Sequence, residues 1–409
     1  MSSNPPTTAQ TDTLVMFSPL PPRKSGIAAY TAELLPSLCL KRRVVLVNEE
    51  GLTPEVQAEL PYCGDALRVI SPAEYEADSS LAALPHVYQI GNNRDHVFAY
   101  EAFKKRPGVL VQHDFNLHYL VEDATLARGD AVGYRDVLRE EYGEPGAVLA
   151  DLRRIGVFSE AQKQTLPVNR HLLHLATGVI VHNHWVYDRL PNEVKARTLV
   201  IPHHFSPLVI EVEGLERAQA RAQLQLPGQG FMVLSLGFIT PPKQIQATLA
   251  ALARLRDQGL NFFFVIAGER NAGFDIDAVI RQHRLEERVV VTGYVPESAF
   301  FQYIVAADCL VNLRHPTVGE SSGTLARALA LGLPAVVHNF GPSSEFPDDV
   351  VLKVPLELGE PRQLAATLEM LMHSAELRAA RGRRAEQYMR HHCSVQHSAA
   401  AYLHFIDQL

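Results

Sequence analysis

Short apolar runs alternate regularly with helix-like stretches along this chain. A strand that helices cover on both faces of a parallel sheet is apolar throughout, so the pattern predicts α/β architecture with doubly wound parallel sheets. The stretches between the runs have the spacing of amphipathic helices. In chain order, the predicted strands are residues 13–19, 43–48, 87–91, 108–114, 176–183, 198–204, 231–237, 262–268, 288–293, 309–313, 334–339 and 350–354.

The strand series divides once, at residues 205–230, which contain no strong strand and end in a Pro/Gly cluster. A chain of 409 residues is long enough for two domains with separate cores. We therefore predict two Rossmann-like domains facing each other across a cleft, followed by a last helix. The predicted bounds are 1–206, 207–390 and 391–409. Ligands of such sheets bind at the carboxyl ends of the strands, so the cleft is the expected site.

Residues 119–170 depart from the alternation because they are charged and helix-like and contain no clear strand. One interpretation is a helical excursion that covers the first domain, as amphipathic helices commonly do. The other is an acceptor-side or membrane-facing element. Composition does not decide between them.

Composition excludes several classes of function. A net charge of -7 gives no basic field that would favour nucleic acid. The four cysteines, Cys39, Cys63, Cys309 and Cys393, are scattered, which indicates neither a zinc site nor a disulfide framework and fits a reducing cytoplasm. The 18 histidines form no HExxH motif, so no metal is expected.

The start of the chain is polar and Pro-rich over residues 1–12, which predicts a loose tail and no secretory signal. The apolar runs are shorter than the roughly 20 residues that span a bilayer. We expect a cytoplasmic protein that could touch the inner surface of the membrane.

A single lysine lies at one strand-to-helix junction of the second domain. Lys243 follows the strand at 231–237 on a turn with two prolines. There its ammonium would pair with a phosphate as a point charge. The alternative is a solvated surface lysine.

A second junction of the same domain begins a helix near Gly323. The first N–H groups of a helix bind anions, and a glycine lets a phosphate approach closely. Glu320, ahead of the helix, would accept hydrogen bonds from ligand hydroxyls. The alternative is capping by Ser322 or Thr324, with Glu320 compensating the helix dipole. Both junctions lie on one edge of the predicted sheet, so together they indicate a diphosphate pocket.

The first domain offers two further candidates. Gly26 forms a tight turn before a helix but lacks the GxGxxG spacing of dinucleotide binders. His113 and Asp114 end the strand at 108–114. Either side chain would contact a substrate or, alternatively, serve the core or a cap.

Taken in order, these motifs resemble those of the GT-B-fold glycosyltransferases, in particular the retaining family 4 type. The resemblance covers nearly the whole chain. Its most specific string is PTVGESSGTLARALALGLPAVV, and the others are SGIAAYTAEL, YQIGNN, HDFNLHYL, GFITPPKQ, VIAGE and VTGYVPES.

The resemblance implies transfer of a hexosyl unit from a nucleotide-diphosphate sugar to an acceptor, in bacterial polysaccharide or glycoconjugate synthesis. The second domain would hold the donor and the first the acceptor, and the last helix would cross back onto the first domain. A GDP-sugar and a UDP-sugar both remain open as donors. The acceptor would be a glycan, a lipid-linked molecule or another compound, and neither cofactor nor metal is implied.

Residue by residue, the resemblance assigns most of the donor site to the second domain. Lys243 matches the family lysine that binds the donor diphosphate, and Ser322, Gly323 and Thr324 match the backbone amides at the same group. Glu320 matches the first glutamate of a paired-glutamate motif that contacts the donor sugar.

Three more residues match positions at the ends of other strands. Val295 lies where the family lines its base pocket. Gly26 matches a glycine loop near the donor phosphates, and His113 matches a first-domain histidine near the reacting sugar. Together with Lys243 and Glu320, His113 is a predicted catalytic residue.

Two departures from the family pattern concern charge. The second glutamate of the pair is absent: counting forward from Glu320 reaches Ala328, and counting back from the glycine after the helix reaches Arg327. Phe238 stands where many members carry an arginine that pairs with the lysine. Arg327 or Arg314 would then supply the lost charge, with Arg327 a predicted donor-binding residue.

The resemblance also implies that the leaving phosphate itself helps to deprotonate the acceptor, since no nucleophile and acid pair is evident in the first domain. Altered sites can retain a fold without its function. The alternatives are a non-catalytic nucleotide-sugar-binding partner of another transferase, or another GT-B enzyme such as a nucleotide-sugar epimerase.

Overall fold

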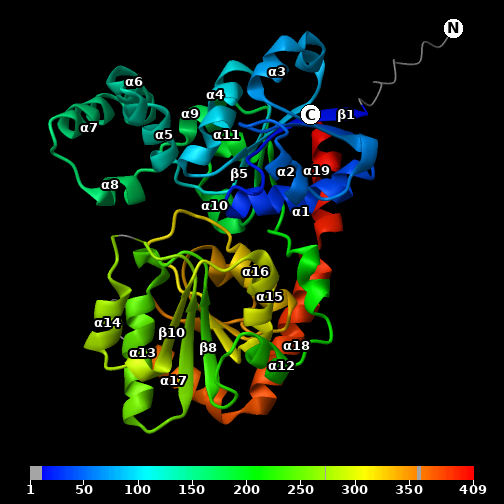
Figure 1. Ribbon diagram of the computed structural model, residues 1–409. Helices are drawn as coiled ribbons and strands as arrows, with labels where there is room; N and C mark the ends of the chain where they lie inside the picture. The colour runs from blue at the N-terminus through cyan, green and yellow to red at the C-terminus, as the bar shows by residue number, and fades with distance from the viewer. Residues whose placement is uncertain (1–11, 272, 357–360) are drawn as a thin grey trace. The chain divides into compact units, whose positions relative to one another are not determined.

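The computed structural model describes residues 12–271, 273–356 and 361–409 (Figure 1). The chain forms two compact units. The N-terminal domain contains the chain up to Pro202 together with Val318–Glu320 and Val395–Leu409. The C-terminal domain contains His203–Thr317 and Ser321–Ser394. The predicted boundaries at 206 and 390 thus differ by a few residues from the division in the structure. The predicted loose tail lies, except for Asp12, outside the described residues.

The N-terminal domain is built on a seven-stranded sheet in which every strand pair is parallel, in the order β3-β2-β1-β4-β5-β6-β7. Six strands lie within the predicted runs or overlap them, and β3 was missed because it is a short edge strand that carries an exposed arginine. The strands are β1 Thr13–Phe17, β2 Arg43–Val47, β3 Leu67–Ile70, β4 His86–Ile90, β5 Val109–Gln112, β6 Gly178–Val181 and β7 Thr198–Val200.

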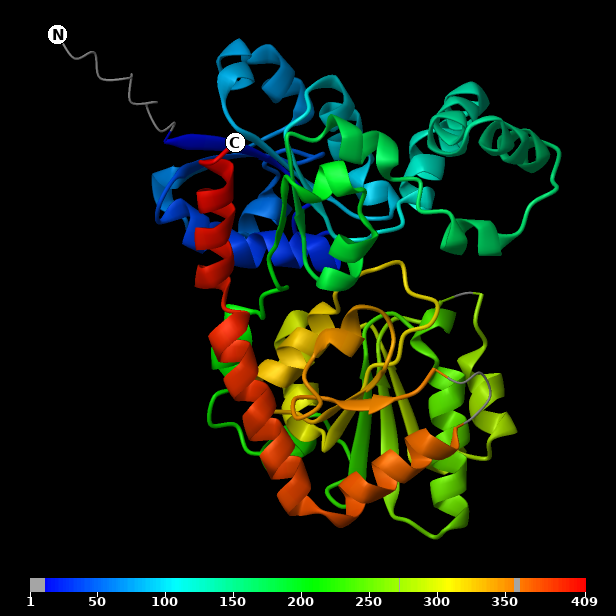
Figure 2. The ribbon, with the colours of Figure 1, turned by 180° about the vertical axis from the view of Figure 1, so that it is seen from behind.

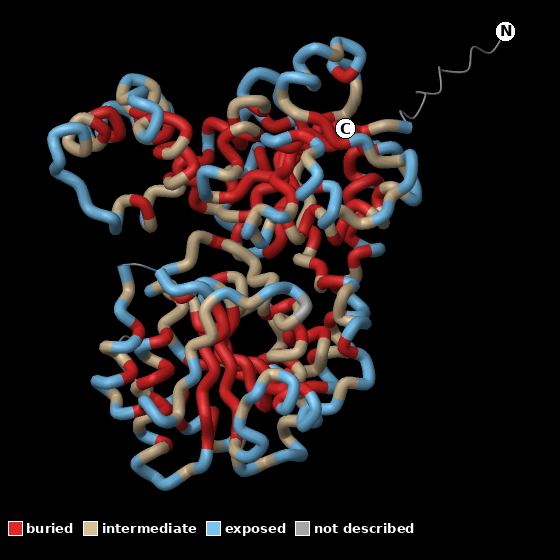
Figure 3. Tube along the Cα trace, viewed as in Figure 1, coloured by how far each residue is buried: buried red, intermediate tan, exposed pale blue. Residues whose placement is uncertain are grey.

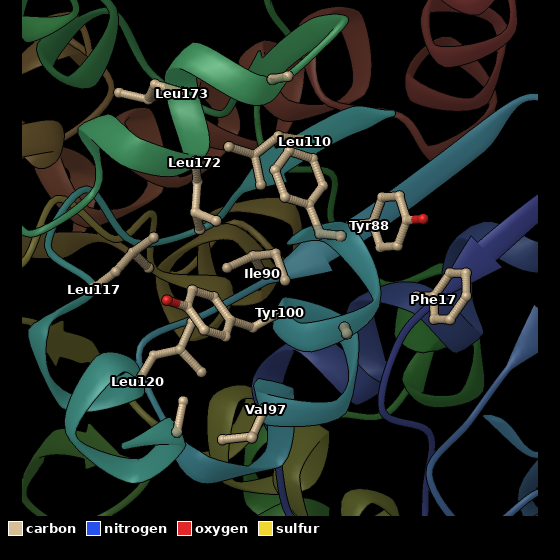
Figure 4. Close-up of a cluster of buried hydrophobic side chains, with 14 of the residues drawn as sticks. Phe17, Tyr88, Ile90, Val97, Tyr100, Leu110, Leu117, Leu120, Leu172 and Leu173 are labelled. Atoms are coloured by element: carbon tan, nitrogen blue, oxygen red, sulfur yellow. The ribbon is translucent and has the colours of Figure 1, made fainter. Parts of the chain in front are cut away.

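Helices cover both faces of this sheet, as the continuously apolar strands require. One face carries α4 and the helices after β5, around the core cluster of Figure 4, which includes Phe17, Tyr88 and Tyr100. The other face carries α1 and α19. The helices are α1 Gly26–Cys39, α2 Pro54–Glu59, α3 Pro72–Ala77, α4 Val97–Lys105, α5 His118–Ala124, α6 Ala131–Tyr142, α7 Glu144–Arg154, α8 Glu160–Thr165, α9 Arg170–Leu175, α10 His184–Arg189, α11 Asn192–Lys195 and α19 Val395–Ile406.

The stretch expected to be helical at 119–170 contains α5 to α8 and the start of α9, and no strand. In Figure 1 α6 and α7 lie side by side at one end of the domain. Tyr134, Leu138 and Ala150 anchor the pair to the core cluster. The excursion is therefore part of the N-terminal domain, and its role toward an acceptor or a membrane stays a prediction.

The C-terminal domain has a six-stranded parallel sheet in the order β10-β9-β8-β11-β12-β13. All residues of β8 and β9 are buried, which Figure 3 shows as a red centre. α15, α16 and α18 cover one face, and α13, α14 and α17 cover the other. The strands are β8 Phe231–Leu236, β9 Phe262–Ala267, β10 Val289–Gly293, β11 Cys309–Val311, β12 Ala335–His338 and β13 Leu352–Val354. The helices are α12 Arg217–Gln223, α13 Ile245–Asp257, α14 Ile276–Gln282, α15 Glu297–Ala306, α16 Gly323–Ala330, α17 Arg362–His373 and α18 Ala375–His392.

The last helix, α19, follows the C-terminal domain in sequence but packs in the N-terminal domain (Figure 2). Tyr402, Leu403, Phe405 and Ile406 share a core cluster with buried residues of α1. Within the described chain, no helix has the length and apolar character needed to cross a membrane.

Candidate active site

The carboxyl end of β8 turns sharply at Gly237, whose φ of +87° lies in the left-handed region that favours glycine. Gly268, at the end of β9, lies against this turn: a Cβ on Gly268 would be 2.0 Å from the Gly237 carbonyl oxygen. Beyond the turn, Phe238 is 49% exposed and Ile239 is buried. Two glycines therefore bring the two strand ends into backbone contact, and the chain leaves this corner toward Lys243.

The short turn η6, Pro241–Lys243, carries the side chain of Lys243 back over the end of β8. Its Nζ donates a hydrogen bond to the carbonyl oxygen of Leu236. A Cβ on Gly237 would stand 2.8 Å from the Lys243 Nζ and 3.9 Å from the Thr324 Oγ1. The structure therefore brings Lys243 and the first turn of α16 to one corner of the C-terminal domain.

The surroundings of Lys243 disfavour the charged form of its side chain. Burial lowers the pKa of Lys243 well below that of a free lysine, and the positive charge of Arg314 lowers it further. A bound anion would offset both effects, because a negative charge beside a lysine favours its protonated form. The surroundings of Lys243 therefore favour contact of its side chain with a diphosphate over contact with solvent.

The start of α16 is capped by the side chain of Ser322. The Ser322 Oγ accepts from the Leu325 backbone N–H at 3.2 Å and lies 3.3 Å from the Asn312 Oδ1, just after β11. Capping by Ser322, one alternative raised by the sequence, is thus present. It uses the hydroxyl of Ser322, whereas an anion would use the amides of the first turn at Gly323 and Thr324.

Glu320 lies in a loop that belongs to the N-terminal domain, although the prediction had placed it within residues 207–390. Its Oε2 accepts a hydrogen bond from the Val318 backbone N–H at 3.0 Å. The Asn116 backbone N–H donates to the Val318 carbonyl oxygen, and the Asn183 side chain donates to the Gly319 carbonyl oxygen. These contacts place Val318–Glu320 beside residues that follow β5 and β6.

The structure separates the two positions considered for the missing second glutamate. Ala328 is fully buried in the core cluster under α16. The Arg327 side chain is 15% exposed, lies 3.5 Å from a carboxylate oxygen of Glu297, and places its guanidinium 5.5 Å from the Phe300 ring centre. Arg327 is therefore the position on the accessible side of α16, and its side chain rests against α15.

Of the two arginines considered as replacements for the family arginine, Arg314 is the one whose charge acts on Lys243. Arg314 follows β11, and its backbone N–H lies 3.3 Å from the His338 Nδ1. Arg327 instead has Glu297 and two phenylalanine rings of α15 as neighbours. Sequence distance did not separate the two, because the direction of each side chain depends on the local turn.

The remaining predicted residues lie in different settings. Val295 is partly buried and packs on the core cluster of α15 and α16. Gly26 begins α1 behind its cap Ser25, and a Cβ on Gly26 would meet no atom within 4 Å. The roles predicted for both remain predictions.

His113 lies at the end of β5, with only 7% of its surface exposed. Its Nε2 is 2.7 Å from the Gln89 Oε1. Its ring lies 4.9 Å from the Tyr30 ring and 4.7 Å from the His182 ring. The position of His113 in the chain was predicted from the strand end, whereas its partner Gln89 was missed because it lies inside an apolar strand.

No set of three or more histidine, cysteine, aspartate or glutamate side chains with the geometry of a metal site occurs in the described part of the chain.

Comparison with solved structures identifies the fold. Sucrose-phosphate synthase from Thermosynechococcus elongatus has a similar structure, with a TM-score of 0.67 at 15% identity over 97% of this chain and 98% of that one. WaaG, a glycosyltransferase of lipopolysaccharide biosynthesis, has a TM-score of 0.60 at 15% identity over 96% and 99%. The Anabaena protein HepE in complex with UDP has a TM-score of 0.65 at 15% identity over 97% and 100%. The fold is the GT-B fold of glycosyltransferases.

Sequence comparison finds a family match in the second half of the chain. Residues 216–388 match the family described as glycosyl transferases group 1. The 2-deoxystreptamine glucosyltransferase of Streptomyces kanamyceticus is 26% identical over 237 residues, 56% of this chain and 60% of the relative. The alpha-monoglucosyldiacylglycerol synthase of Streptococcus pneumoniae is 29% identical over 176 residues, 41% and 39%. Each match covers less than two thirds of the relative.

Proposed function

We propose that the protein is a retaining glycosyltransferase that moves a sugar, most simply a hexose, from a nucleotide-diphosphate sugar to an acceptor. The observation that carries the proposal is the corner formed by Gly237, Lys243 and the first turn of α16. A desolvated ammonium and helix N–H groups meet there, and both favour a diphosphate. The match of residues 216–388 to glycosyl transferases group 1 supports the same assignment.

Stabilising the leaving diphosphate would be the main task of this corner. Glycosyl transfer develops negative charge on the diphosphate as the bond to the sugar breaks, and preorganised donors lower that barrier. Lys243 and the amides at Gly323 and Thr324 would supply these donors without a metal ion. Arg314 would add a second positive charge where the exposed Phe238 offers none.

The other assignments rest on the family pattern. Glu320 and His113 would contact the donor sugar, Val295 would line the base pocket, and Gly26 would lie near the donor phosphates. The N-terminal domain would bind the acceptor. We place the protein in the cytoplasm, able to bind the inner surface of the membrane, and in the synthesis of a bacterial polysaccharide or glycoconjugate.

A panel of nucleotide sugars tests the donor assignment. Thermal unfolding would be followed with GDP-, UDP- and dTDP-sugars, and a donor at 100 times its Kd would stabilise the protein by about 2.7 kcal/mol. One base is expected to stabilise the protein far more than the others. The absence of any shift across the panel would contradict nucleotide-sugar binding.

Turnover tests the chemical step. The acceptors would include 2-deoxystreptamine and a diacylglycerol, which appear in the names of the relatives above. Lys243→Ala is expected to lower kcat by roughly 100-fold or more, the range for loss of one transition-state donor. A Lys243→Ala protein with nearly the wild-type rate would remove Lys243 from the mechanism.

A non-catalytic nucleotide-sugar-binding protein is the second candidate. The observation that favours it is the absence of a carboxylate on the accessible side of α16, where Arg327 stands in its place. Thermal shifts by a donor without turnover on any acceptor would support this candidate.

A further inference from the structure

Two of the four cysteines meet at one edge of the N-terminal domain, although they belong to separate segments of the chain. Cys39 is the last residue of α1, and Cys63 precedes η1, Gly64–Ala66, the short turn that leads into β3. Both side chains pack against the core cluster of α1 and α19. The structure therefore brings together two thiols that spacing along the chain did not pair.

The contacts of the Cys39 side chain place its sulfur at this turn. The Cys39 thiol donates to the carbonyl oxygen of Ala66 at 3.9 Å, and the Ala66 backbone N–H donates to the Cys63 carbonyl oxygen at 3.4 Å. The thiols of Cys39 and Cys63 are also hydrogen-bonded to each other. A disulfide joins two sulfurs at about 2.0 Å. Two thiols already in contact reach that distance by rotation of their side chains.

The edge that carries the two thiols is open to solvent. Leu40, directly after Cys39, is 85% exposed, and Tyr62, directly before Cys63, is 95% exposed. Both cysteines are themselves partly exposed, whereas the other two cysteines of the chain are buried. A small reagent therefore reaches this pair of thiols more easily than the other two.

The two thiols also differ in acidity. The hydrogen bond with Cys39 lowers the pKa of Cys63, and burial opposes this effect. The same hydrogen bond, together with burial, raises the pKa of Cys39. A thiolate, and not a thiol, attacks a disulfide. We therefore expect Cys63 to react first with an external disulfide and Cys39 to complete the exchange.

We propose that Cys39 and Cys63 form a reversible disulfide by exchange with a low-molecular-weight disulfide. Each cysteine first gives its proton to water. The Cys63 sulfur attacks the reagent, forms a mixed disulfide and releases one thiolate. The Cys39 sulfur then attacks the Cys63 sulfur and releases the second thiolate. Two protein thiols are thus oxidised to one disulfide, the reagent is reduced to two thiols, and the end of α1 becomes tied to the turn before β3.

Such a bond is a modification and not a permanent part of the framework. Thiols in a reducing compartment stay reduced, and the disulfides that form there are mostly transient responses to oxidation. In the cytoplasm proposed above, α1 and η1 would be linked only under oxidising conditions. Neither donor nor acceptor takes part in this reaction, so its test does not depend on the proposed function.

Equilibration of the folded, full-length protein with reduced and oxidised glutathione tests the pairing. The samples would be quenched with an alkylating reagent, and their peptides would be mapped by mass spectrometry. Of the pairs that four cysteines allow, only Cys39–Cys63 is expected. In samples quenched early, glutathione is expected on Cys63, and its appearance on Cys39 first would overturn the order of the two steps. A different pair, or thiols that stay reduced or remain joined to glutathione at equilibrium, would overturn the proposal.

The same titration in urea measures how far folding favours the bond. The equilibrium constant for closing the disulfide is expected to be about tenfold larger or more in the folded protein than in the unfolded chain, because the fold already holds the thiols together. The oxidised protein should accordingly unfold at a higher urea concentration than the reduced protein. An equal or smaller constant in the folded protein would mean that the fold keeps the two sulfurs from bonding, contrary to the proposal.

Single substitutions check the two partners. Cys39→Ala and Cys63→Ala each leave one thiol of the pair, so their reaction should stop at a mixed disulfide with glutathione. Cys393→Ala is the matched control, because it removes a thiol from the core of the C-terminal domain and should leave the titration of the pair unchanged. An intramolecular disulfide in either single variant, or its loss in Cys393→Ala, would contradict the pairing of Cys39 with Cys63.

Discussion

Donor binding should take up a proton at Lys243. Burial and then Arg314 hold the pKa of Lys243 well below that of a free lysine, so the side chain is neutral above that lowered value. A bound diphosphate favours the ammonium and raises the pKa again. Between the two pKa values, binding requires one proton from solution. The affinity therefore falls about tenfold, or ~1.4 kcal/mol, for each pH unit in this window.

Isothermal titration in buffers of different ionisation enthalpy measures the number of protons taken up. A nucleotide-diphosphate sugar is the appropriate ligand, because its phosphates are esterified and do not titrate near neutral pH. The number of protons should approach one within the window and fall to zero at lower pH. It should vanish in Lys243→Met. In Arg314→Met the window should move to higher pH, because a positive charge near Lys243 is removed.

The lowered pKa of Lys243 also determines whether the free energy of unfolding rises or falls with pH. Where the folded pKa of Lys243 is lowered, the unfolded chain binds more protons, so its contribution to the free energy of unfolding rises with pH up to the ordinary lysine pKa. Lys243→Met should lose this slope in denaturation curves. Donor binding without proton uptake from neutral to alkaline pH, or equal uptake in Lys243→Met, would refute the reasoning.

Phe238→Arg should tighten donor binding about tenfold, the value of a charge-assisted hydrogen bond, because the exposed position can accept a long side chain; calorimetry that shows unchanged affinity would place residue 238 away from the diphosphate. Ala328→Glu should lower the free energy of unfolding in urea by about 3 kcal/mol or more, since it buries a carboxylate in the core, whereas Arg327→Glu should cost about 1 kcal/mol. Equal stability of the two variants would contradict the orientation of α16. Gly268→Ala should weaken donor binding at least tenfold, on the order of 1.4 kcal/mol, because its Cβ would stand 2.0 Å from the Gly237 carbonyl oxygen and displace the turn; wild-type affinity in this variant would show that the turn can shift without loss.

Much of the fold could be predicted because its strands are buried on both faces. β8 and β9 read as continuous apolar runs, and every one of their residues is buried. β3 escaped prediction because an edge strand needs fewer apolar residues: two of its four residues are buried. The loop at Val318–Glu320 could not be assigned to its domain, since hydrogen bonds with the Asn116 backbone and the Asn183 side chain decide this and leave no mark in the local sequence.

The candidate site divides in the same way. The meeting of Lys243 with the start of α16 follows from a general property of parallel sheets, in which strand ends share one edge. The choice between Arg314 and Arg327 does not follow from this property of parallel sheets. It depends on the direction in which each side chain leaves its turn or helix. The neighbours of His113 were also beyond reach, since Gln89, Tyr30 and His182 come from three separate parts of the chain.

The packing of α19 against α1 has a consequence for biosynthesis. During translation the N-terminal sheet emerges first, but the helix that covers one of its faces is made only after the whole C-terminal domain. Until then the apolar side of α1 remains without its native cover, a state in which nascent chains are prone to aggregate. A fragment ending at Pro202 should therefore require a chaperone, or the separately supplied α19 segment, to stay in solution. A segment made after the C-terminal domain would thus complete the domain that precedes it in the chain.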